Sequence, residues 1–143
     1  MAIIVKDVMV KNVIVAEPSV TLIRAAKTMD EYGIGCLVIV TKNKISGIFT
    51  ERDMIKCVAR GVEPKDTKLS QIMTKDVVTI SYDKTVEDAI DLMKKHNIKK
   101  LPVLKDKTLV GIITTSDIIV VAPALIESVS SLISFESPKY QGG

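Results

Sequence analysis

The feature that most restricts the fold of this chain is an internal repeat. Met9 matches Met73, 64 positions later, and the register holds without a gap when residues 5–55 are aligned with residues 69–119. Most positions that are not identical keep their apolar character. Identical pairs include Lys11 with Lys75, Val13 with Val77, Thr21 with Thr85, Ala25 with Ala89, Met29 with Met93, Gly47 with Gly111, Thr50 with Thr114 and Asp53 with Asp117. A fixed period of this length indicates two tandem copies of one folding unit.

The pattern of apolar and polar residues in each copy predicts the order strand, helix, strand, strand, helix. A β-branched run predicts the first strand, apolar residues at i, i+3, i+4 and i+7 predict the first helix, and two apolar runs around a polar turn predict a hairpin. Thr21 and Thr85 stand where helix N-caps belong, and Gly33 and Asn97 stand where left-handed C-terminal residues belong. The predicted elements are 13–16, 22–29, 36–40, 45–49 and 50–60 in the first copy, and 77–80, 86–93, 101–104, 109–113 and a helix from Thr114 in the second.

The length and composition favour one domain assembled from both copies. The chain has 143 residues, 47% of them hydrophobic, and a single copy buries too little surface to be stable alone. We therefore expect an α+β fold in which two pseudo-two-fold-related copies, 1–61 and 62–122, pack sheet against sheet with helices outside. Residues 123–143 predict a C-terminal amphipathic helix with a frayed end from Ser134, and the pattern leaves open whether this helix packs in cis or across a dimer. Its apolar positions are Leu125, Ile126, Val129, Leu132 and Ile133, with Pro123 at its start.

The block Gly-Ile-x-Thr-x-x-Asp, at 47–53 and 111–117, has the residues of either a ligand site or a helix cap. It ends a predicted strand and opens a predicted helix, where free N–H groups and the helix dipole favour an anion. The Gly permits close approach of the backbone, the Thr supplies a hydroxyl, and the Asp can accept hydrogen bonds from both ribose hydroxyls. Thr-x-x-Asp is also nearly the capping-box pattern, in which the two side chains satisfy backbone N–H groups of the helix. The residues by themselves leave both interpretations open.

Three motifs together resemble those of paired cystathionine beta-synthase (CBS) domains, an arrangement called a Bateman module. They are Val-Lys-Asp-Val-Met at 5–9, Leu-Pro-Val at 101–103, and the two Gly-Ile-x-Thr-x-x-Asp blocks. The resemblance covers about residues 3–122. It implies that the Thr and Asp of each block hold the ribose and phosphate of a nucleotide, in a cleft between the copies.

The resemblance also implies which residues line the ligand sites, and it implies that the two sites are not equivalent. Lys99 and Lys100 align with basic positions that meet phosphates in nucleotide-sensing relatives, whereas the first copy has Gly35 and Cys36 there. Arg52 is a partial substitute for that charge. The implied ligand-binding residues are Val15, Ala16, Gly35, Cys36, Gly47, Thr50, Arg52 and Asp53 in the first copy, and Thr79, Ile80, Lys99, Lys100, Leu101, Pro102, Gly111, Thr114, Ser116 and Asp117 in the second.

Other patterns argue against several classes of function. Two cysteines and one histidine are too few for a disulfide framework or a zinc site. The sequence has no Ser, His and Asp set and no Walker loop, so we expect neither an enzyme nor a cofactor. The longest apolar stretch, 118–126, is far shorter than the roughly 20 residues of a membrane-spanning helix, and the N-terminus lacks a secretory pattern. We therefore expect a cytoplasmic protein that has no membrane partner.

The resemblance implies a regulatory module that senses AMP, ADP or ATP, with S-adenosylmethionine or NAD as alternative ligands. It also implies a homodimer, and we expect the module to signal to a separate protein that the sequence does not identify. Two alternatives are a nucleic-acid-binding protein that uses the basic cluster of Lys94, Lys95, Lys99 and Lys100, and a dimerisation module with empty clefts. A net charge of +3 and an aromatic content of 3% disfavour the first alternative.

Overall fold

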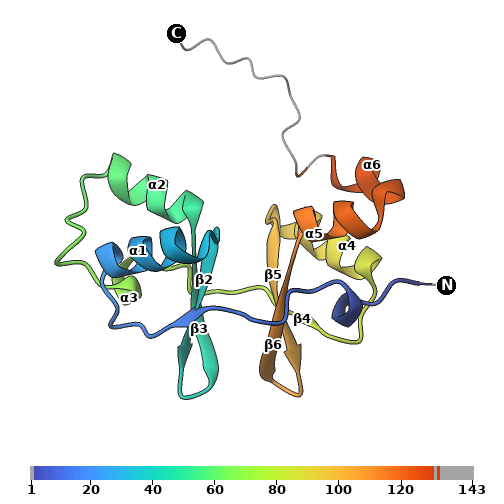
Figure 1. Cartoon of the computed structure of the whole chain (residues 1–143), viewed down its shortest axis with the longest axis horizontal. Helices are drawn as coiled ribbons and strands as arrows, with labels where there is room; N and C mark the ends of the chain where they lie inside the picture. Colours follow the sequence, from blue (N-terminus) through green and yellow to red (C-terminus); the bar gives the residue numbers. More distant parts are fainter. Residues whose placement is uncertain (1, 131, 133–143) are drawn as a thin grey trace, which may run out of the picture. The chain divides into compact units, whose positions relative to one another are not determined.

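The computed structural model describes residues 2–130 and residue 132, and the chain in it divides into two units (Figure 1). The first-copy unit comprises Asn12–Val77 and Lys107–Leu109. The second-copy unit comprises the residues up to Lys11, Val78–Asp106 and the residues from Val110 onward. Each unit contains one three-stranded sheet, in the order β1-β2-β3 or β4-β5-β6. The predicted α+β fold with two tandem copies is confirmed.

In the first-copy unit, β1 (Val15–Ala16) runs parallel to β2 (Cys36–Thr41), and β2 is antiparallel to β3 (Lys44–Thr50). The helix α1 (Leu22–Tyr32) connects the parallel pair, and α2 (Glu51–Ala59) follows β3 directly. A parallel pair needs a crossover connection, which α1 supplies. The strand β1 is shorter than predicted because only its two residues pair with β2.

The second-copy unit repeats this order. The strand β4 (Ile80–Ser81) leads through α4 (Val86–His96) to β5 (Lys100–Lys105), and β6 (Thr108–Thr114) leads into α5 (Thr115–Val121). The pairing of β4 with β5 is again parallel and again two residues long. Both copies therefore place a strand end directly before a helix, at the position of the Gly-Ile-x-Thr-x-x-Asp block.

The ends of the first helix in each copy follow the predicted local signals. The Thr21 hydroxyl accepts a hydrogen bond from the backbone N–H of Arg24, at 3.4 Å, and Thr85 caps α4 in the same way. The helix α1 ends at Gly33, with φ +62°, and α4 ends at Asn97, with φ +52°. These are left-handed conformations, which glycine and asparagine adopt more readily than other residues. The predicted caps are confirmed.

The segment that opens the sequence packs on the second-copy unit. A single 3₁₀ turn, η1 (Val5–Asp7), contains the fully buried Val5, whose N–H donates to the carbonyl of Lys84 at 2.8 Å. Further on, Val10 and Ile112 exchange two backbone hydrogen bonds, at 2.8 and 3.0 Å. The first residues of the chain are thus part of the core and sheet edge of the later copy.

The segment between the copies makes the same contacts on the first-copy unit. The short helix α3 (Leu69–Ile72) contains the fully buried Leu69, whose N–H donates to the carbonyl of Val20 at 2.8 Å. Thr74 and Ile48 exchange two backbone hydrogen bonds, at 2.9 and 3.0 Å. Each opening segment therefore packs on the other copy. The segment before the first copy packs on the second-copy unit, and the segment before the second copy packs on the first-copy unit. The packing units consequently differ from the sequence ranges 1–61 and 62–122.

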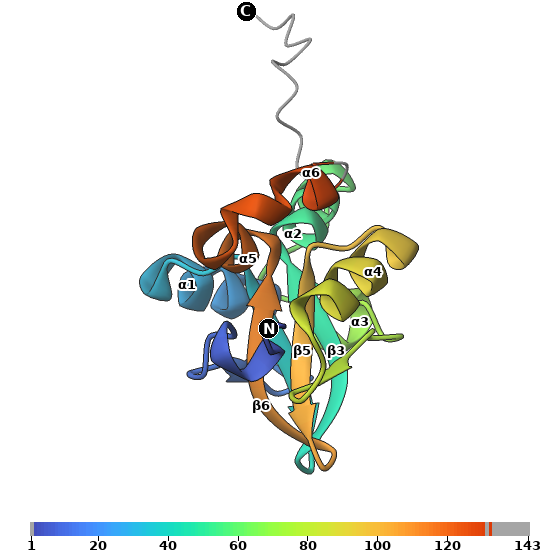
Figure 2. The same cartoon turned by 90° about the vertical axis from the view of Figure 1, so that its right-hand side faces the viewer.

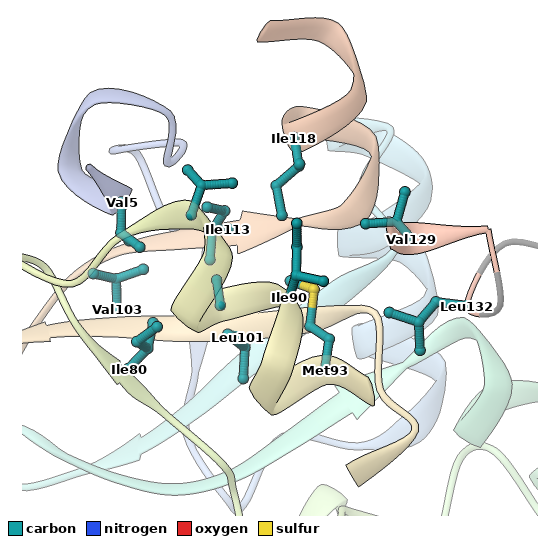
Figure 3. Close-up of a cluster of buried hydrophobic side chains, with 12 residues drawn as sticks. Val5, Ile80, Ile90, Met93, Leu101, Val103, Ile113, Ile118, Val129 and Leu132 are labelled. Atoms are coloured by element: carbon teal, nitrogen blue, oxygen red, sulfur yellow. The ribbon is translucent and has the colours of Figure 1, made fainter. Parts of the chain in front are cut away.

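Each unit has its own cluster of buried apolar side chains. In the second-copy unit, Figure 3 shows Val5, Ile80 and Val103 at one end of the cluster and Ile90 and Met93 further along it. The first-copy cluster is built from the same elements. Its buried members are Leu22, Ala25, Met29, Leu37, Ile39, Phe49, Cys57 and Leu69. Burial of these side chains supplies the main stabilisation of each unit, at about 25 cal/mol per Å² of apolar area.

Among the described residues, the C-terminal segment adds helical turns to the second-copy unit that have no counterpart in the first-copy unit. A 3₁₀ turn, η2 (Pro123–Leu125), leads into α6 (Ile126–Val129), which lies beside α5 and α4 (Figures 1 and 2). Val129 and Leu132 are buried in the second-copy cluster, so they pack in cis. The helix that the sequence predicts extends to Ile133, and the frayed end that it predicts begins at Ser134. Both of those positions lie outside the described residues.

Candidate ligand-binding site

The predicted ligand-binding residues lie at the same places in both units. One group is on the first strand or just before it, a second is at the start of the strand after the first helix, and a third spans the end of the last strand and the following helix. In the first-copy unit these groups are Val15 and Ala16, then Gly35 and Cys36, then Gly47, Thr50, Arg52 and Asp53. In the second-copy unit they are Thr79 and Ile80, then Lys99, Lys100, Leu101 and Pro102, then Gly111, Thr114, Ser116 and Asp117.

The register of the sheet brings two of these groups together in the first-copy unit. Cys36 pairs with Thr50 across the antiparallel strands. The parallel neighbours are Val15 with Val38 and Ala16 with Ile39. The start of β2 and the end of β3 are therefore direct neighbours, and α2 leaves the sheet from this point.

The Thr and Asp of each block form a capping box. In α2, the Thr50 N–H donates to Asp53 Oδ2 at 2.9 Å, and the Asp53 N–H donates to Thr50 Oγ1 at 3.3 Å. In α5, the corresponding distances between Thr114 and Asp117 are 3.0 and 3.2 Å. The hydroxyl of each Thr also donates to the same Oδ2. The capping interpretation is confirmed, and it occupies one carboxylate oxygen of each Asp.

The second carboxylate oxygen differs between the units. Asp53 Oδ1 accepts a long hydrogen bond, 3.5 Å, from the hydroxyl of Thr74 in the opening segment of the next copy. The corresponding residue beside Asp117 is Val10, which has no hydroxyl. Among the described residues, Asp117 Oδ1 has no hydrogen-bond partner. Asp117 is therefore better prepared than Asp53 to accept a hydrogen bond from a ligand.

The two glycines of the blocks are explained by packing inside the protein. A Cβ at Gly47 would lie 2.5 Å from Met73 Sδ, and a Cβ at Gly111 would lie 2.5 Å from Met9 Sδ. Each methionine belongs to the opening segment that packs on that unit. The sequence suggested that these glycines admit a ligand, but the structure gives their missing side chains a different reason. Only glycine leaves room for the methionine and the neighbouring backbone carbonyl.

The residue after the last strand and the residue whose carbonyl it contacts carry different charges in the two units, a glutamate with a glycine in the first copy and a threonine with a lysine in the second. The Glu51 N–H donates to the carbonyl of Gly35, and the Thr115 N–H donates to the carbonyl of Lys99, both at 3.0 Å. In the first-copy unit, the Glu51 carboxylate occupies the space that a Cβ at Gly35 would take. In the second-copy unit this pair of positions has a lysine and a buried threonine. The first-copy position therefore disfavours an anion, and the second-copy position favours one.

Two hollows lie near these residues, one in each unit. In the second-copy unit, a hollow of about 290 Å³ is lined by Thr79 and Ile80 together with side chains of α4, among them Asp88 and Asp91. In the first-copy unit, a hollow of about 510 Å³ between α1 and α2 is lined in part by Gly35 and Glu51. Thr79, Ile80 and Gly35 are the predicted residues that line these hollows.

The pKa values of two side chains near the site region depart from their ordinary range, those of Cys57 and Asp88. Burial, with the Asp53 charge as a further cause, raises the pKa of the Cys57 thiol above its ordinary value, which makes a thiolate nucleophile unfavourable. The backbone N–H of Thr85 lowers the pKa of Asp88, because that hydrogen bond favours the charged carboxylate. Within residues 2–130 and at 132, no group of three or more metal-ligating side chains is present and no helix is long and apolar enough to cross a membrane.

Comparison with known proteins identifies the repeat. The model of the CBS domain matches twice, at residues 5–60 and 69–123, which together are more than half of the chain. The chain belongs to the CBS-domain family. An uncharacterized protein of Methanopyrus kandleri, MK0525, is 37% identical over 140 residues, covering 96% of this chain and 69% of that protein. CBS-domain pairs are regulatory ligand-binding modules, so this coarse function holds for the chain.

Two solved structures are similar in fold and sequence. The CBS domain pair of protein MJ0100, in complex with 5′-methylthioadenosine and S-adenosyl-L-methionine, superposes with a TM-score of 0.79 at 32% identity, covering 87% of this chain and 98% of that one. A hexameric CBS-CP12 protein from bloom-forming cyanobacteria superposes with a TM-score of 0.80 at 32% identity, covering 89% of this chain and 75% of that one. The first relative binds adenosine derivatives, and the second self-associates.

Sequence reasoning missed two residues of the site region, Glu51 and Thr74. The 64-residue register contains a signal for both, because it aligns Glu51 with Thr115 and Thr74 with Val10. The consequences of these differences were not predictable. The carboxylate of Glu51 reaches back over Gly35, and Thr74 reaches Asp53 from 21 residues away in the chain.

Proposed function

We propose that this protein is a regulatory module that binds an adenine nucleotide of the AMP, ADP or ATP type. The ligand contacts come mainly from the second-copy unit. In this proposal the protein acts as a homodimer in the cytoplasm and passes the signal to a separate protein. It is not an enzyme, and the effect of the nucleotide is conformational.

The observation that carries this proposal is the arrangement at the start of β5 and α5. The carbonyl of Lys99 accepts a hydrogen bond from the N–H of Thr115, the first residue of α5. Asp117 Oδ1 has no hydrogen-bond partner among the described residues. A nucleotide has complementary groups for both, since its phosphates pair with lysine and its ribose hydroxyls donate to carboxylate. Lys99 is exposed and Lys100 is half-buried, so both are accessible from solvent.

The first-copy residues favour a different kind of ligand. Glu51 and Gly35 replace Thr115 and Lys99, and the second oxygen of Asp53 already accepts from Thr74. Only Arg52 adds positive charge to the block. A ligand here would be an adenosine derivative without phosphates. S-adenosylmethionine, which is bound by the relative MJ0100, has a sulfonium cation that suits the Glu51 carboxylate.

The proposed mechanism is a shift between conformations that already exist. Phosphates that neutralise Lys99 and Lys100 remove the repulsion between these side chains, so the conformation that brings them together gains population. The size of the shift is limited by the difference in ligand affinity between the conformations. The regulated protein then recognises the conformation that the nucleotide favours.

The test is a comparison of two double variants by calorimetry with ATP, AMP and adenosine. Lys99→Met with Lys100→Met should weaken ATP and AMP binding by about 1.5 to 3 kcal/mol per lost charge-assisted hydrogen bond, and adenosine binding much less. Lys94→Met with Lys95→Met, in the last turn of α4, is the matched control. These exposed lysines should contribute less than about 1 kcal/mol.

Equal losses in the two double variants would show a diffuse surface field and contradict the proposed site. Equal losses for ATP and adenosine would show that the phosphates are not the recognised group. Binding of RNA or DNA with a steep dependence on salt would instead favour a nucleic-acid-binding function.

A further inference from the structure

The opening segments, residues 2–11 and 66–75, each place a methionine directly against the glycine of a last strand. Met9 Sδ lies 2.5 Å from the position that a Cβ on Gly111 would take, and Met73 Sδ lies at the same distance from that position on Gly47. Each sulfur therefore contacts the backbone of the strand that it faces, β6 or β3. Both units use the same contact to seat an opening segment on a strand.

Next to each sulfur, one isolated bridge holds the opening segment on its strand. Val10 and Ile112 exchange two backbone hydrogen bonds in the second-copy bridge, and Thr74 and Ile48 do so in the first-copy bridge. The N–H groups of all four residues are used in these bonds. They are therefore not available to a new acceptor at the sulfur while the segment is seated.

The methionines of the opening segments differ from those of the core in their access to solvent. Met9 and Met73 are half-buried. Met93 is 0% exposed and Met29 is 7% exposed. A thioether that solvent reaches is open to oxidation by a peroxide, whereas a thioether inside a packed core is shielded from it.

Oxidation of either methionine would change its contact with the glycine. Hydrogen peroxide transfers one oxygen atom to the sulfur: the O–O bond breaks, an S–O bond forms, the thioether loses two electrons and the peroxide leaves as water. The sulfoxide is polar, and it is larger than the thioether by one oxygen. The nearest backbone atom at each contact is a carbonyl oxygen, that of Val10 or Thr74, 2.9 or 3.1 Å from the Cβ position. This atom repels a second oxygen, so the sulfoxide is better solvated in water than at the glycine.

We propose that Met9 and Met73 are sites of reversible oxidation by a peroxide, and that the sulfoxide releases the opening segment from its strand. In the reduced state the thioether packs on the glycine and the neighbouring bridge is closed. In the oxidised state the side chain turns to water and the bridge opens. The inference goes beyond the proposed nucleotide site, because neither methionine is among its contacts and no step requires a nucleotide.

Three double variants of the full chain each leave a single half-buried methionine among the described residues. Met54→Leu with Met73→Leu keeps Met9, and Met9→Leu with Met54→Leu keeps Met73. Met9→Leu with Met73→Leu keeps Met54, which is the matched control: it is also half-buried and packs on the first-copy cluster, but it is not among the atoms nearest to either glycine. Leucine conserves the volume of methionine and has no sulfur to oxidise.

Each variant is treated with hydrogen peroxide, the sulfoxide is located by mass spectrometry of peptides, and amide hydrogen exchange is measured without nucleotide. In the variant that keeps Met9, oxidation should speed exchange at the second-copy bridge about tenfold or more and leave the first-copy bridge unchanged. The variant that keeps Met73 should show the reverse. The control should change at neither bridge. Methionine sulfoxide reductases should restore slow exchange in the first two variants.

Three results would overturn the proposal. One is that the peroxide leaves Met9 and Met73 unmodified in the folded chain. Another is that their sulfoxides form and exchange at both bridges stays slow. The third is that the Met54 sulfoxide speeds exchange as much, which would show a general loosening of the fold.

Thermal melts before treatment establish which variants are folded. For any variant that does not fold, the parent chain takes its place. The fraction of molecules with fast exchange at each bridge is then compared with the sulfoxide fraction at the methionine beside it. The proposal requires these two fractions to be equal, and it is wrong if they are unrelated.

Discussion

The first-copy unit leaves the groove between α1 and α2 open, whereas the second-copy unit closes the groove between α4 and α5 with Val129 and Leu132. The two units otherwise share their strand order, the capping box at the start of α2 or α5, and a glycine against which a methionine packs. The comparison teaches that the duplication has kept the contacts that build each core. The differences are at the surfaces available to other molecules.

The second contrast is in charge at the position where the last strand meets its helix. The first-copy unit has Glu51 over Gly35, and the second-copy unit has Lys99 beside Thr115. Because the backbone hydrogen bond at this place is the same in both units, the change of side chains alters the charge at each position and leaves the fold as it is. Four predictions test these contrasts, beginning with the largest expected effect.

Val129→Asp should lower the free energy of unfolding by about 3 to 5 kcal/mol, because it places an unpaired charge in the second-copy cluster. Val129 is 0% exposed. Lys65→Asp, at the matching exposed position of the first copy, should change stability by less than about 0.5 kcal/mol. Urea denaturation measures both. Equal effects would mean that the C-terminal segment is not part of the second-copy core.

Asp117→Ala should weaken binding of the adenine nucleotide by about 1.5 to 3 kcal/mol, since a hydrogen bond to a charged group is lost. Asp53→Ala should leave that affinity nearly unchanged, because Asp53 Oδ1 is shared with Thr74. Both changes remove a capping box and should cost about 1 kcal/mol of stability. Calorimetry with unchanged affinity in Asp117→Ala would contradict the assignment of the ribose contact.

Gly111→Ala should destabilise the protein by about 1 to 3 kcal/mol, because the new methyl group overlaps Met9. Met9→Ala in the same chain should relieve part of this cost, whereas Met73→Ala should not. Gly47→Ala should show the reverse coupling. A double-mutant cycle in which Gly111 couples to Met73 would contradict the exchange of opening segments.

The smallest effect concerns the first helix of each copy. Asp88 completes a capping box in α4, and the pKa of its carboxyl is lowered. Its contribution to stability is therefore fully present above the ordinary aspartate pKa of 3.8. The contribution disappears as the pH falls through the lowered pKa. The acid unfolding curve of Asp88→Asn should therefore lack this part of the pH dependence. The corresponding position of α1 is Arg24, and Arg24→Asp should stabilise α1 by about 0.5 kcal/mol. An unchanged acid curve in Asp88→Asn would show that the carboxylate contributes nothing.

Most of the fold was predictable because its determinants are local in the sequence. The caps at Thr21, Thr85, Gly33 and Asn97 depend on the intrinsic preferences of single residues, and the helices follow from apolar periodicity. The 64-residue register then determined that the same unit occurs twice. The capping box was also visible as Thr-x-x-Asp, although its residue types fit a ligand site equally well.

Only the tertiary structure decided which contacts the opening segments make and which groove is filled. Val5 and Leu69 occupy equivalent positions of the two copies, and both are apolar and buried. An apolar residue at this position fits burial in either unit, so the sequence gives no preference between the two units. The choice is made by contacts over long sequence separations, such as Met9 against Gly111 and Thr74 against Asp53. Periodicity indicates that a side chain is buried, but the partner that buries it depends on how distant segments fit together.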